Sequence, residues 1–243
     1  MDLGLAGKSA LVTASSRGLG RATAVALARE GVRVVICARG ADALKDAADE
    51  IAAGGGQVVA LAEDVTRPEA PQRLVDATVE AFGGIDVLVA NAGGPPPGRA
   101  LEVDDAALSA ALNANLLTSI RLVRASVPHM RASGWGRICL ITSSFVKQPS
   151  PALALSNTAR TGLWAWAKTA AADVFPDGIT MNLACPGLHA TDRVKDLGLG
   201  PAGEAIGDPG DFGKVVAFLC SEAAGFISGS AVLIDGGRTI GLL

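Results

Sequence analysis

The 243-residue chain contains no tyrosine, only two histidines, and 4% aromatic residues in all. A phenol therefore cannot serve as an acid or a base anywhere in this protein. Its four cysteines, Cys37, Cys139, Cys185 and Cys220, are scattered and form no C-x-x-C pair. We expect buried, reduced thiols in a cytosolic protein, and we predict no metal site.

Neither sign of charge is in large excess, and no long hydrophobic run is present. Lys and Arg number 21 against 24 Asp and Glu, which gives a net charge of -3 without a basic patch. This balance argues against nucleic acid as a main partner. No run approaches the roughly 18 apolar residues of a membrane span, and residues 1–4 lack the basic start of a signal peptide. We predict a cytoplasmic protein with no membrane partner.

What the chain does contain is a regular alternation of short apolar runs and helical stretches. The expected strands are residues 8–13, 32–38, 58–62, 85–90, 137–142, 179–184 and 231–234. The expected helices are residues 21–29, 41–53, 68–82, 104–131, 153–174 and 209–221. This order predicts an α/β fold, in which one domain spanning residues 1–243 forms a Rossmann-type, doubly wound parallel sheet. About seven strands would have helices on both faces.

Two loops rich in glycine and proline interrupt this alternation. Residues 94–98 (GPPPG) are either a rigid connection or a stiff wall beside a ligand. Residues 197–209 are a Gly/Pro-rich surface loop, which we expect over the site as part of a short lid at 192–208.

The first strand is followed by a glycine-containing turn, residues 13–20 (TASSRGLG), that opens the first helix. Glycines at such a turn let backbone N–H groups approach a diphosphate, whose charge the helix N-terminus favours. Such turns also occur for packing alone, but the position in a strand–helix repeat favours dinucleotide binding. The predicted binding residues are Thr13, Ser15, Ser16, Arg17, Gly18, Leu19 and Gly20.

The end of the second strand predicts which dinucleotide binds. No acid stands there to bond the ribose 2′-hydroxyl of NAD, because the first acid after Arg39 is Asp42. Arg39 and Arg17 could instead hold a 2′-phosphate, which favours NADP(H) over NAD(H). The alternative for Arg39 is a solvated loop charge. Asp64 and Val65 are placed to meet the adenine, although Asp64 could equally cap the next helix.

Together these pieces resemble the classical short-chain dehydrogenase/reductase family, especially its 3-oxoacyl-[acyl-carrier-protein] reductase-like members, almost from end to end. Thr13–Gly20 is similar to the family's TGxxxGxG turn, with Ala14 in place of the first glycine. The further matching segments are Asn91-Ala92-Gly93, the helix residue Asn115, the strand leading to Ser143, Pro186-Gly187 with Thr191, Ser228-Gly229 and Asp235-Gly236-Gly237. The resemblance implies that Ser143 is catalytic, that Asn115 holds a proton-relay water, and that Pro186, Gly187 and Thr191 clamp the nicotinamide.

The chain departs from the family where the chemistry is expected. The family's Tyr-x-x-x-Lys falls on Ser156, thirteen residues after Ser143, and on Arg160. The chain therefore looks like a divergent subgroup that lacks this motif. Serine donates a hydrogen bond but does not ionise near neutral pH, and arginine keeps its charge without acting as a proton reservoir. Ser143, Ser144 and Ser156 could still polarise a carbonyl, and Arg160 could still contact the nicotinamide ribose.

Two other side chains could replace the missing acid. Lys147 follows Ser143 by four residues and is otherwise a solvated loop lysine. His189 lies inside the nicotinamide segment and is otherwise a histidine packed on the protein.

We expect an NADP(H)-dependent carbonyl reductase or alcohol dehydrogenase with an altered catalytic site, acting on a small carbonyl or alcohol substrate. The alternative is a dinucleotide-binding protein with little or no dehydrogenase activity. A non-redox lyase, like the dehalogenase relatives with arginine in the lysine position, fits less well because those keep the tyrosine and abandon the glycine turn. Family members pair two long helices across a dimer, so residues 104–131 and 153–174 imply a homo-oligomer, a dimer or a tetramer.

Overall fold

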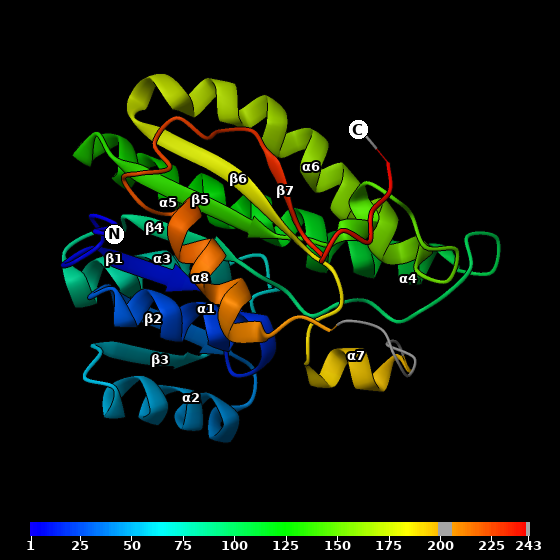
Figure 1. The fold of residues 1–243 in the computed structure, drawn as a ribbon, viewed down its shortest axis with the longest axis horizontal. Coiled ribbons are helices and arrows are strands. Elements are labelled where there is room, and N and C mark those ends of the chain that lie inside the picture. The colour runs from blue at the N-terminus through cyan, green and yellow to red at the C-terminus, as the bar shows by residue number, and fades with distance from the viewer. Residues whose placement is uncertain (199–205, 242–243) are drawn as a thin grey trace.

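A single parallel sheet organises the protein, whose computed structural model describes residues 1–198 and 206–241 (Figure 1). Its strands follow the order β3-β2-β1-β4-β5-β6-β7. They are β1 Ser9–Val12, β2 Arg33–Ala38, β3 Val58–Ala62, β4 Val87–Ala90, β5 Gly136–Ile141, β6 Ile179–Pro186 and β7 Ala231–Ile234. The helices between them are α1 Gly18–Arg29, α2 Ala41–Ala53, α3 Ala70–Phe82, α4 Asp105–Leu112, α5 Thr118–Ser133, α6 Ala154–Val174, α7 Asp192–Asp196 and α8 Pro209–Leu219. The predicted doubly wound Rossmann fold is confirmed.

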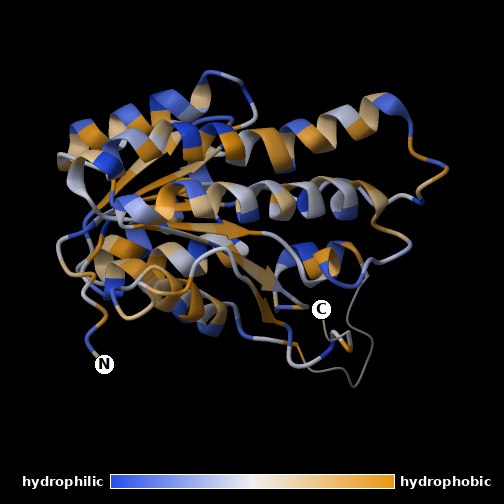
Figure 2. Ribbon diagram, turned by 90° about the horizontal axis from the view of Figure 1, so that it is seen from above, coloured by the Kyte–Doolittle hydropathy of each residue, from blue (hydrophilic) through white to orange (hydrophobic). Residues whose placement is uncertain are grey.

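Each face of the sheet has its own apolar core, because successive strand side chains point to opposite faces. On one face, Leu11 and Leu88 pack in a cluster to which α3, α5 and α6 contribute. On the other, Val12 packs with Leu27 of α1 and Phe212 of α8. Figure 2 shows the apolar strands lying between the helices. The strand sequences are continuous apolar runs because helices cover both faces of the sheet.

The helical region predicted at residues 104–131 is not one regular helix. Asp104 caps α4 by accepting a hydrogen bond from the Ala107 N–H at 2.7 Å. The π-helical turn η1, Asn113–Leu117, then separates α4 from α5, and α5 continues to Ser133. A π-turn leaves the apolar pattern of the helix nearly unchanged, so the sequence did not indicate it. Such turns gather at functional sites, and this one contains Asn115.

By length and composition only, the helical stretch at residues 105–133 is long and apolar enough to cross a membrane. This is weak evidence, because a core helix passes the same test. In the structure α5 packs against α3, β4 and β5.

Several predicted element boundaries are corrected by side-chain hydrogen bonds and turns. The strand predicted at 85–90 begins at Val87, and the carboxylate of the preceding Asp86 bonds the Ser9 N–H at 2.8 Å. The helix predicted at 68–82 begins at Ala70, after a turn closed by the Arg67 N–H on Asp64 O. The predicted lid at 192–208 contains the short helix α7, and its residues 199–205 lie outside the described residues.

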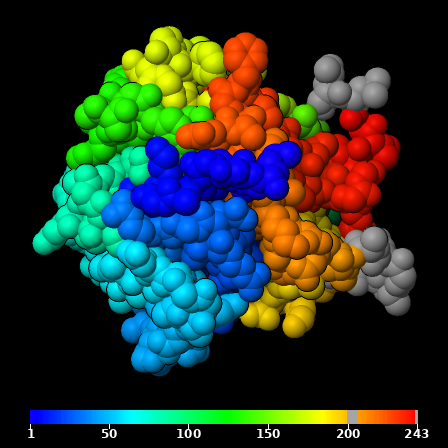
Figure 3. Space-filling model, turned by 60° about the vertical axis from the view of Figure 1, so that its left-hand side comes forward, coloured from blue at the N-terminus to red at the C-terminus, as the bar shows by residue number. Residues whose placement is uncertain are grey.

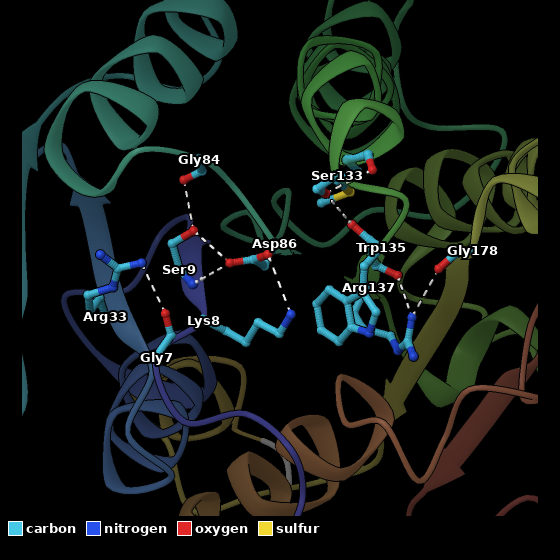
Figure 4. Close-up of polar contacts among 12 residues, drawn as sticks. Gly7, Lys8, Ser9, Arg33, Gly84, Asp86, Ser133, Trp135, Arg137 and Gly178 are labelled. Atoms are coloured by element: carbon cyan, nitrogen blue, oxygen red, sulfur yellow. Dashed lines mark hydrogen bonds and ion pairs between the residues drawn. The ribbon is translucent and has the colours of Figure 1, made fainter.

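The amino ends of the strands form a tightly bonded base (Figure 4). The Ser9 N–H and hydroxyl both donate to Asp86, and Lys8 lies 3.8 Å from the same carboxylate. The ring of Trp135 lies between the Lys8 ammonium, at 4.0 Å from its centroid, and the Arg137 guanidinium, at 4.3 Å. The first residues run across the surface beside α8 (Figure 3), where Leu3 accepts a bond from the Glu222 N–H. These contacts pair Ser9, Lys8 and Asp86 with one another at this end.

The carboxyl ends of the strands are where a ligand would bind. β1 has β2 on one side and β4 on the other, so the chain winds outward in both directions from this point. In open parallel sheets the ligand crevice lies outside the carboxyl ends at such a switch point. The loops after β1, β4 and β6 and helix α7 lie at this edge (Figure 1).

Candidate active site

The turn after β1 has the backbone shape that a diphosphate site needs. Gly18 has a φ of 59°, and a Cβ on Gly20 would collide with the Ala14 carbonyl oxygen. The half-exposed Ser16 and the exposed Arg17 lead into α1, with Arg17 in the extended cap position. No bulkier residue fits at Gly20, so the backbone of the turn stays close to the N-terminus of α1. This is the geometry that the sequence predicted for a diphosphate.

Hydrogen bonds hold this turn against the end of β4. The Thr13 hydroxyl donates to Asn91 O at 2.7 Å and accepts from the Asn91 N–H at 2.9 Å. Asn91 Nδ2 donates to Ala14 O at 3.1 Å. The Ser15 hydroxyl points inward, donating to Val12 O at 2.7 Å, and the Ser15 N–H donates to Cys37 O at 3.0 Å, so neither donor is free for a ligand. The predicted segments after β1 and β4 therefore meet.

A cavity of about 340 Å³ lies at the ends of β2 and β3, lined by Arg39, Ala62, Glu63, Asp64 and Arg67. Glu63 is paired with Arg73 at 2.7 Å, and Asp64 accepts two bonds from Thr66, which, with Arg39 and Arg67 nearby, lower the pKa of its carboxyl. Asp64 thus caps the turn after β3, and the alternative that it caps the next helix is wrong, because the N-cap of α3 is Glu69. Both guanidiniums that line the cavity are exposed, and neither donates a hydrogen bond within the described residues.

On the other side of the crevice, the segment after β6 reaches back to the glycine turn. The Gly187 N–H donates to Ile234 O at 2.9 Å, next to Asp235. Asp235 accepts bonds from the N–H groups of Gly237 and Thr239. A Cβ on Gly18 would lie 3.6 Å from the Thr191 methyl group. The glycine turn and the predicted nicotinamide segment, which starts at Pro186 in β6, therefore flank one crevice.

Ser143 and Asn115, two of the predicted catalytic residues, lie after β5 and in the π-turn η1, respectively. Ser143 follows β5, and its hydroxyl accepts a bond from the Phe145 N–H at 3.2 Å. The π-turn buries Asn115 to 3% exposure, and its Oδ1 has no hydrogen-bond partner among the described residues. A buried, unpaired acceptor is unusual and suits a water or a ligand proton.

Arg160 lies beneath the carboxyl ends of β4 and β5. Its Nη1 donates to Ile141 O and Thr142 O, both at 2.9 Å, and its Nη2 to Ala92 O at 3.5 Å. Burial, and then the charge of Arg193, lower its pKa to about 10, so it remains charged at neutral pH. Ser156 precedes it by one helical turn on the same face of α6 and is half-buried.

Lys147 and His189, the two side chains that could replace the missing acid, lie in different surroundings. The Lys147 ammonium lies 5.4 Å from the centroid of the Trp164 ring on α6. His189 is buried, with Nδ1 3.3 Å from Gly187 O and its ring edge-on to Phe212 at 5.3 Å. The packing of His189 favours the structural interpretation over the catalytic one.

A second cavity, of about 320 Å³, adjoins Ser143. It is lined by Ser144, Phe145, Gln148, Gly187, Leu188, Arg238 and Thr239. The Ile240 N–H donates to Gln148 Oε1 at 3.1 Å, so the C-terminal segment closes this side. The cavity has the size and position of a small-molecule site.

The cysteines take no part in this site. All four are free and buried, as predicted. Burial raises the pKa of Cys37 to about 12 and that of Cys185 to about 11, which makes them inert as nucleophiles.

Three arginines at the crevice were missed from the sequence: Arg67, Arg193 and Arg238. Each follows a recognised segment, at three residues after Asp64, two after Thr191 and one after Gly237. In the sequence, each of these residues is an arginine just after a motif. Such an arginine cannot be distinguished by sequence from a solvated surface charge. Only the fold places Arg193 against Gly94 and Pro95, where its Nη2 donates to Pro95 O.

Known proteins are similar to this chain along nearly its whole length. The family model described as enoyl-(acyl carrier protein) reductase matches residues 13–239. The human dehydrogenase/reductase SDR family member 4 is 33% identical, over 96% of this chain and 88% of its own. The chain belongs to the short-chain dehydrogenase/reductase family.

Other members of this short-chain dehydrogenase/reductase family are equally similar. The 3-oxoacyl-[acyl-carrier-protein] reductase of Synechocystis is 33% identical over 97% of this chain and 98% of its own. The structure of L-sorbose reductase from Gluconobacter frateurii, complexed with NADPH and L-sorbose, has a TM-score of 0.92 with 33% identity and covers 100% of both chains. The chain is thus a member of a family of NAD(P)-dependent oxidoreductases.

Proposed function

We propose that this protein is an NADP(H)-dependent reductase of small carbonyl compounds, or the corresponding alcohol dehydrogenase, with Ser156 and Arg160 in place of the family's Tyr and Lys. The observation that carries the proposal is a crevice whose whole length suits the cofactor, from Arg39 to Thr191, beside a cavity at Ser143. L-sorbose reductase, of matching fold, is complexed with NADPH and a small polar substrate.

The residues present fit a dinucleotide phosphate. Gly18 and Gly20 keep the turn close enough for its N–H groups to meet a diphosphate. Arg39 and Arg67 face one cavity with their guanidinium donors free among the described residues, which suits a 2′-phosphate, and Arg17 lies exposed on the glycine turn. The bound dinucleotide would supply or accept a hydride.

The chain's own groups would act on the substrate carbonyl. Ser143 and Ser156 donate hydrogen bonds to its oxygen, and the charge of Arg160 stabilises the negative charge that develops there. Asn115 holds a water with its unpaired Oδ1, and the proton reaches the substrate oxygen from solvent. The absence of a dedicated acid is expected to lower the rate by about 10²–10⁴ relative to members that have one.

The first test is a fluorescence titration of the pure protein with NADPH and with NADH. We expect NADPH to bind more tightly, and Arg39→Gln and Arg67→Gln each to weaken NADPH by about tenfold while leaving NADH unchanged. Arg29→Gln, an exposed arginine at the opposite end of α1, is the matched control. Equal affinities for the two cofactors would contradict the assignment of Arg39 and Arg67.

The second test asks whether the site performs chemistry. A carbonyl panel is screened with NADPH for the native chain, for Ser156→Tyr/Arg160→Lys, and for Ser156→Phe/Arg160→Lys. The tyrosine variant should be faster than the native chain, and the phenylalanine variant, which has the ring without the hydroxyl, should not be. Cofactor binding without turnover in the native chain would count against a reductase.

The second candidate is a dinucleotide-binding protein with little or no dehydrogenase activity. The position of Arg160 favours this candidate. Its Nη1 donates hydrogen bonds to two carbonyl oxygens, so the guanidinium cannot act as a mobile proton carrier. Hydride transfer above background in the native chain would remove it.

A further inference from the structure

Arg160 is a buried positive charge without a negative partner. Only 7% of its surface is exposed, and its hydrogen bonds to the described residues all go to uncharged backbone carbonyls. Within residues 1–198 and 206–241, no carboxylate forms an ion pair with it. A buried charge is unfavourable unless an opposite charge compensates it, so this site is expected to receive an anion.

A second guanidinium is anchored to the same loop. Arg160 donates to Ala92 O, and Arg193, at the start of α7, donates to Pro95 O three residues further on. Arg193 lies flat against Gly94, since a Cβ there would be 3.1 Å from its Nε and Nη2. The adjacent Asp192 is 3.7 Å from Lys195, and no ion pair links Arg193 to an acid within the described residues. The loop after β4 therefore anchors two cations, the buried Arg160 and the exposed Arg193.

The adjoining cavity adds to this positive field. Among the described residues that line it, Arg238 is the only charged one, beside the polar Ser144, Gln148 and Thr239. The polar side chains of this lining can form hydrogen bonds with a ligand.

The cofactor itself does not supply the missing negative charge at this end. The diphosphate is expected at the glycine turn on α1, and an oxidised nicotinamide would add a further positive charge. A tyrosine could ionise to balance these cations, but Ser156 cannot. The balancing charge has to arrive with the substrate.

We propose that the substrate of this site is a carbonyl compound bearing a carboxylate, a keto acid or its hydroxy acid, whose carboxylate binds Arg193. The reduction of such a substrate rests on the proposed function, whereas the binding of its carboxylate does not. The planar guanidinium fork of Arg193 matches a carboxylate, and the loop after β4 that holds Arg193 through Pro95 O also holds Arg160 through Ala92 O. Arg193 is then a specificity-determining residue.

The test measures binding without turnover, so that it stands apart from the proposed function. Saturated carboxylates of three to six carbons and benzoate, each with its primary amide, are titrated by ligand-observed NMR into the protein with and without NADPH. We expect the acids to bind about tenfold more tightly than their amides. Arg193→Gln should abolish that difference, leave amide binding unchanged and leave NADPH binding unchanged, whereas Arg29→Gln should keep the difference.

The outcomes separate the two proposals. Equal binding of acids and amides to the native protein overturns this inference, even if NADPH binds. A variant Arg193→Gln that loses NADPH affinity but keeps the preference for acids also overturns it, because Arg193 would then serve the cofactor. A preference for acids that depends on Arg193 in a protein that binds no NADPH supports the carboxylate site and contradicts the reductase.

A turnover experiment extends the test to the substrate class. The native protein is assayed with NADPH against 2-oxo and 3-oxo acids and against their methyl esters. The measured quantity is kcat/KM, which we expect to be higher for each acid than for its ester. A higher value for the esters would contradict a carboxylate-bearing substrate.

Discussion

Arg160 stands at the position of the family's lysine and forms hydrogen bonds that this motif position does not predict. Its guanidinium joins the carboxyl end of β5 to the loop after β4, through Ile141 O, Thr142 O and Ala92 O. A lysine has a single ammonium in place of the planar fork and could not span the same carbonyls in this way. The exchange therefore makes the site more rigid and leaves it positively charged.

Ala14 is strained at the place where the family has glycine. It is the only residue other than glycine with a positive φ, 47°, among the described residues. The left-handed region costs a residue with a Cβ about 1–2 kcal/mol, and glycine loses about 0.5–1 kcal/mol more than alanine in chain entropy on folding. We predict that Ala14→Gly raises the free energy of unfolding by about 0.5 kcal/mol, measured by urea denaturation.

The control for Ala14→Gly is the same substitution in a regular helix. Ala28→Gly lies within α1 and should lower the free energy of unfolding by about 1 kcal/mol. A loss of stability in Ala14→Gly as large as in Ala28→Gly would show that the turn is not strained.

At the scale of elements, the π-turn between α4 and α5 places Asn115 where its Oδ1 is buried and unpaired. An unsatisfied buried acceptor costs about 1–3 kcal/mol. We predict that Asn115→Leu raises the free energy of unfolding by about 1 kcal/mol in thermal or urea denaturation and lowers any reductase activity.

A second buried asparagine provides the matched control. Asn182 in β6 donates from Nδ2 to Ile227 O at 2.6 Å and accepts at Oδ1 from the Ser230 N–H at 3.1 Å. Asn182→Leu should therefore destabilise the protein by about 2 kcal/mol. If both variants lose stability alike, Asn115 has no special role in the turn.

Helices α1 and α8 cross closely at a glycine. A Cβ on Gly213 would lie 2.5 Å from Ala22 O and 3.2 Å from the Ala26 methyl group, neither of which is the end of a flexible side chain. Gly162 in α6 has its nearest neighbour, a methyl group of Leu116, at 3.7 Å. The first glycine is required by packing, and the second is not.

We predict opposite effects for the same substitution at these glycines. Gly213→Ala should lower the free energy of unfolding by about 1–3 kcal/mol because the helices must separate. Gly162→Ala should raise it by about 0.5–1 kcal/mol through helix propensity. Urea denaturation of both variants checks the pair, and a gain in stability for Gly213→Ala would show that the crossing relaxes easily.

At the scale of the whole molecule, the two ends of the sheet differ in what their polar groups do. At the amino end, Ser9, Asp86 and Lys8 satisfy one another, and Trp135 lies between two cations (Figure 4). At the carboxyl end, the buried Oδ1 of Asn115 is unpaired among the described residues, and the buried Arg160 bonds only to uncharged backbone carbonyls. This asymmetry follows from parallel strands, since all their carboxyl ends open to the same crevice.

We propose that two copies associate through the long helices α5 and α6. The half-exposed side chains of Trp164 and Trp166 lie on α6, and Leu117, on the adjoining π-turn, is 40% exposed. Burying such apolar surface against a second copy is favourable. Light scattering should give the mass of a dimer or a tetramer, and Trp166→Glu should dissociate it while Lys168→Glu, an exposed change on the same helix, should not. A monomeric native protein would contradict the proposal.

The sequence by itself determined the order of strands and helices, the turn after β1 and the register of the segments at Asn91, Ser143 and Pro186. These are local patterns, in which period, turn residues and spacing are read directly from neighbouring residues. The absence of tyrosine was also visible there. The predicted cofactor residues and the roles of Ser143 and Ser156 remain predictions.

Only the tertiary structure decided which charges meet. Arg193 and Pro95 are 98 residues apart, and Arg160 and Ala92 are 68 apart, so no local pattern connects them. The same holds for Arg39 and Arg67, which come together because β2 and β3 end side by side. The physical reason is that a charge at a loop is solvated or part of a site according to what the fold brings against it.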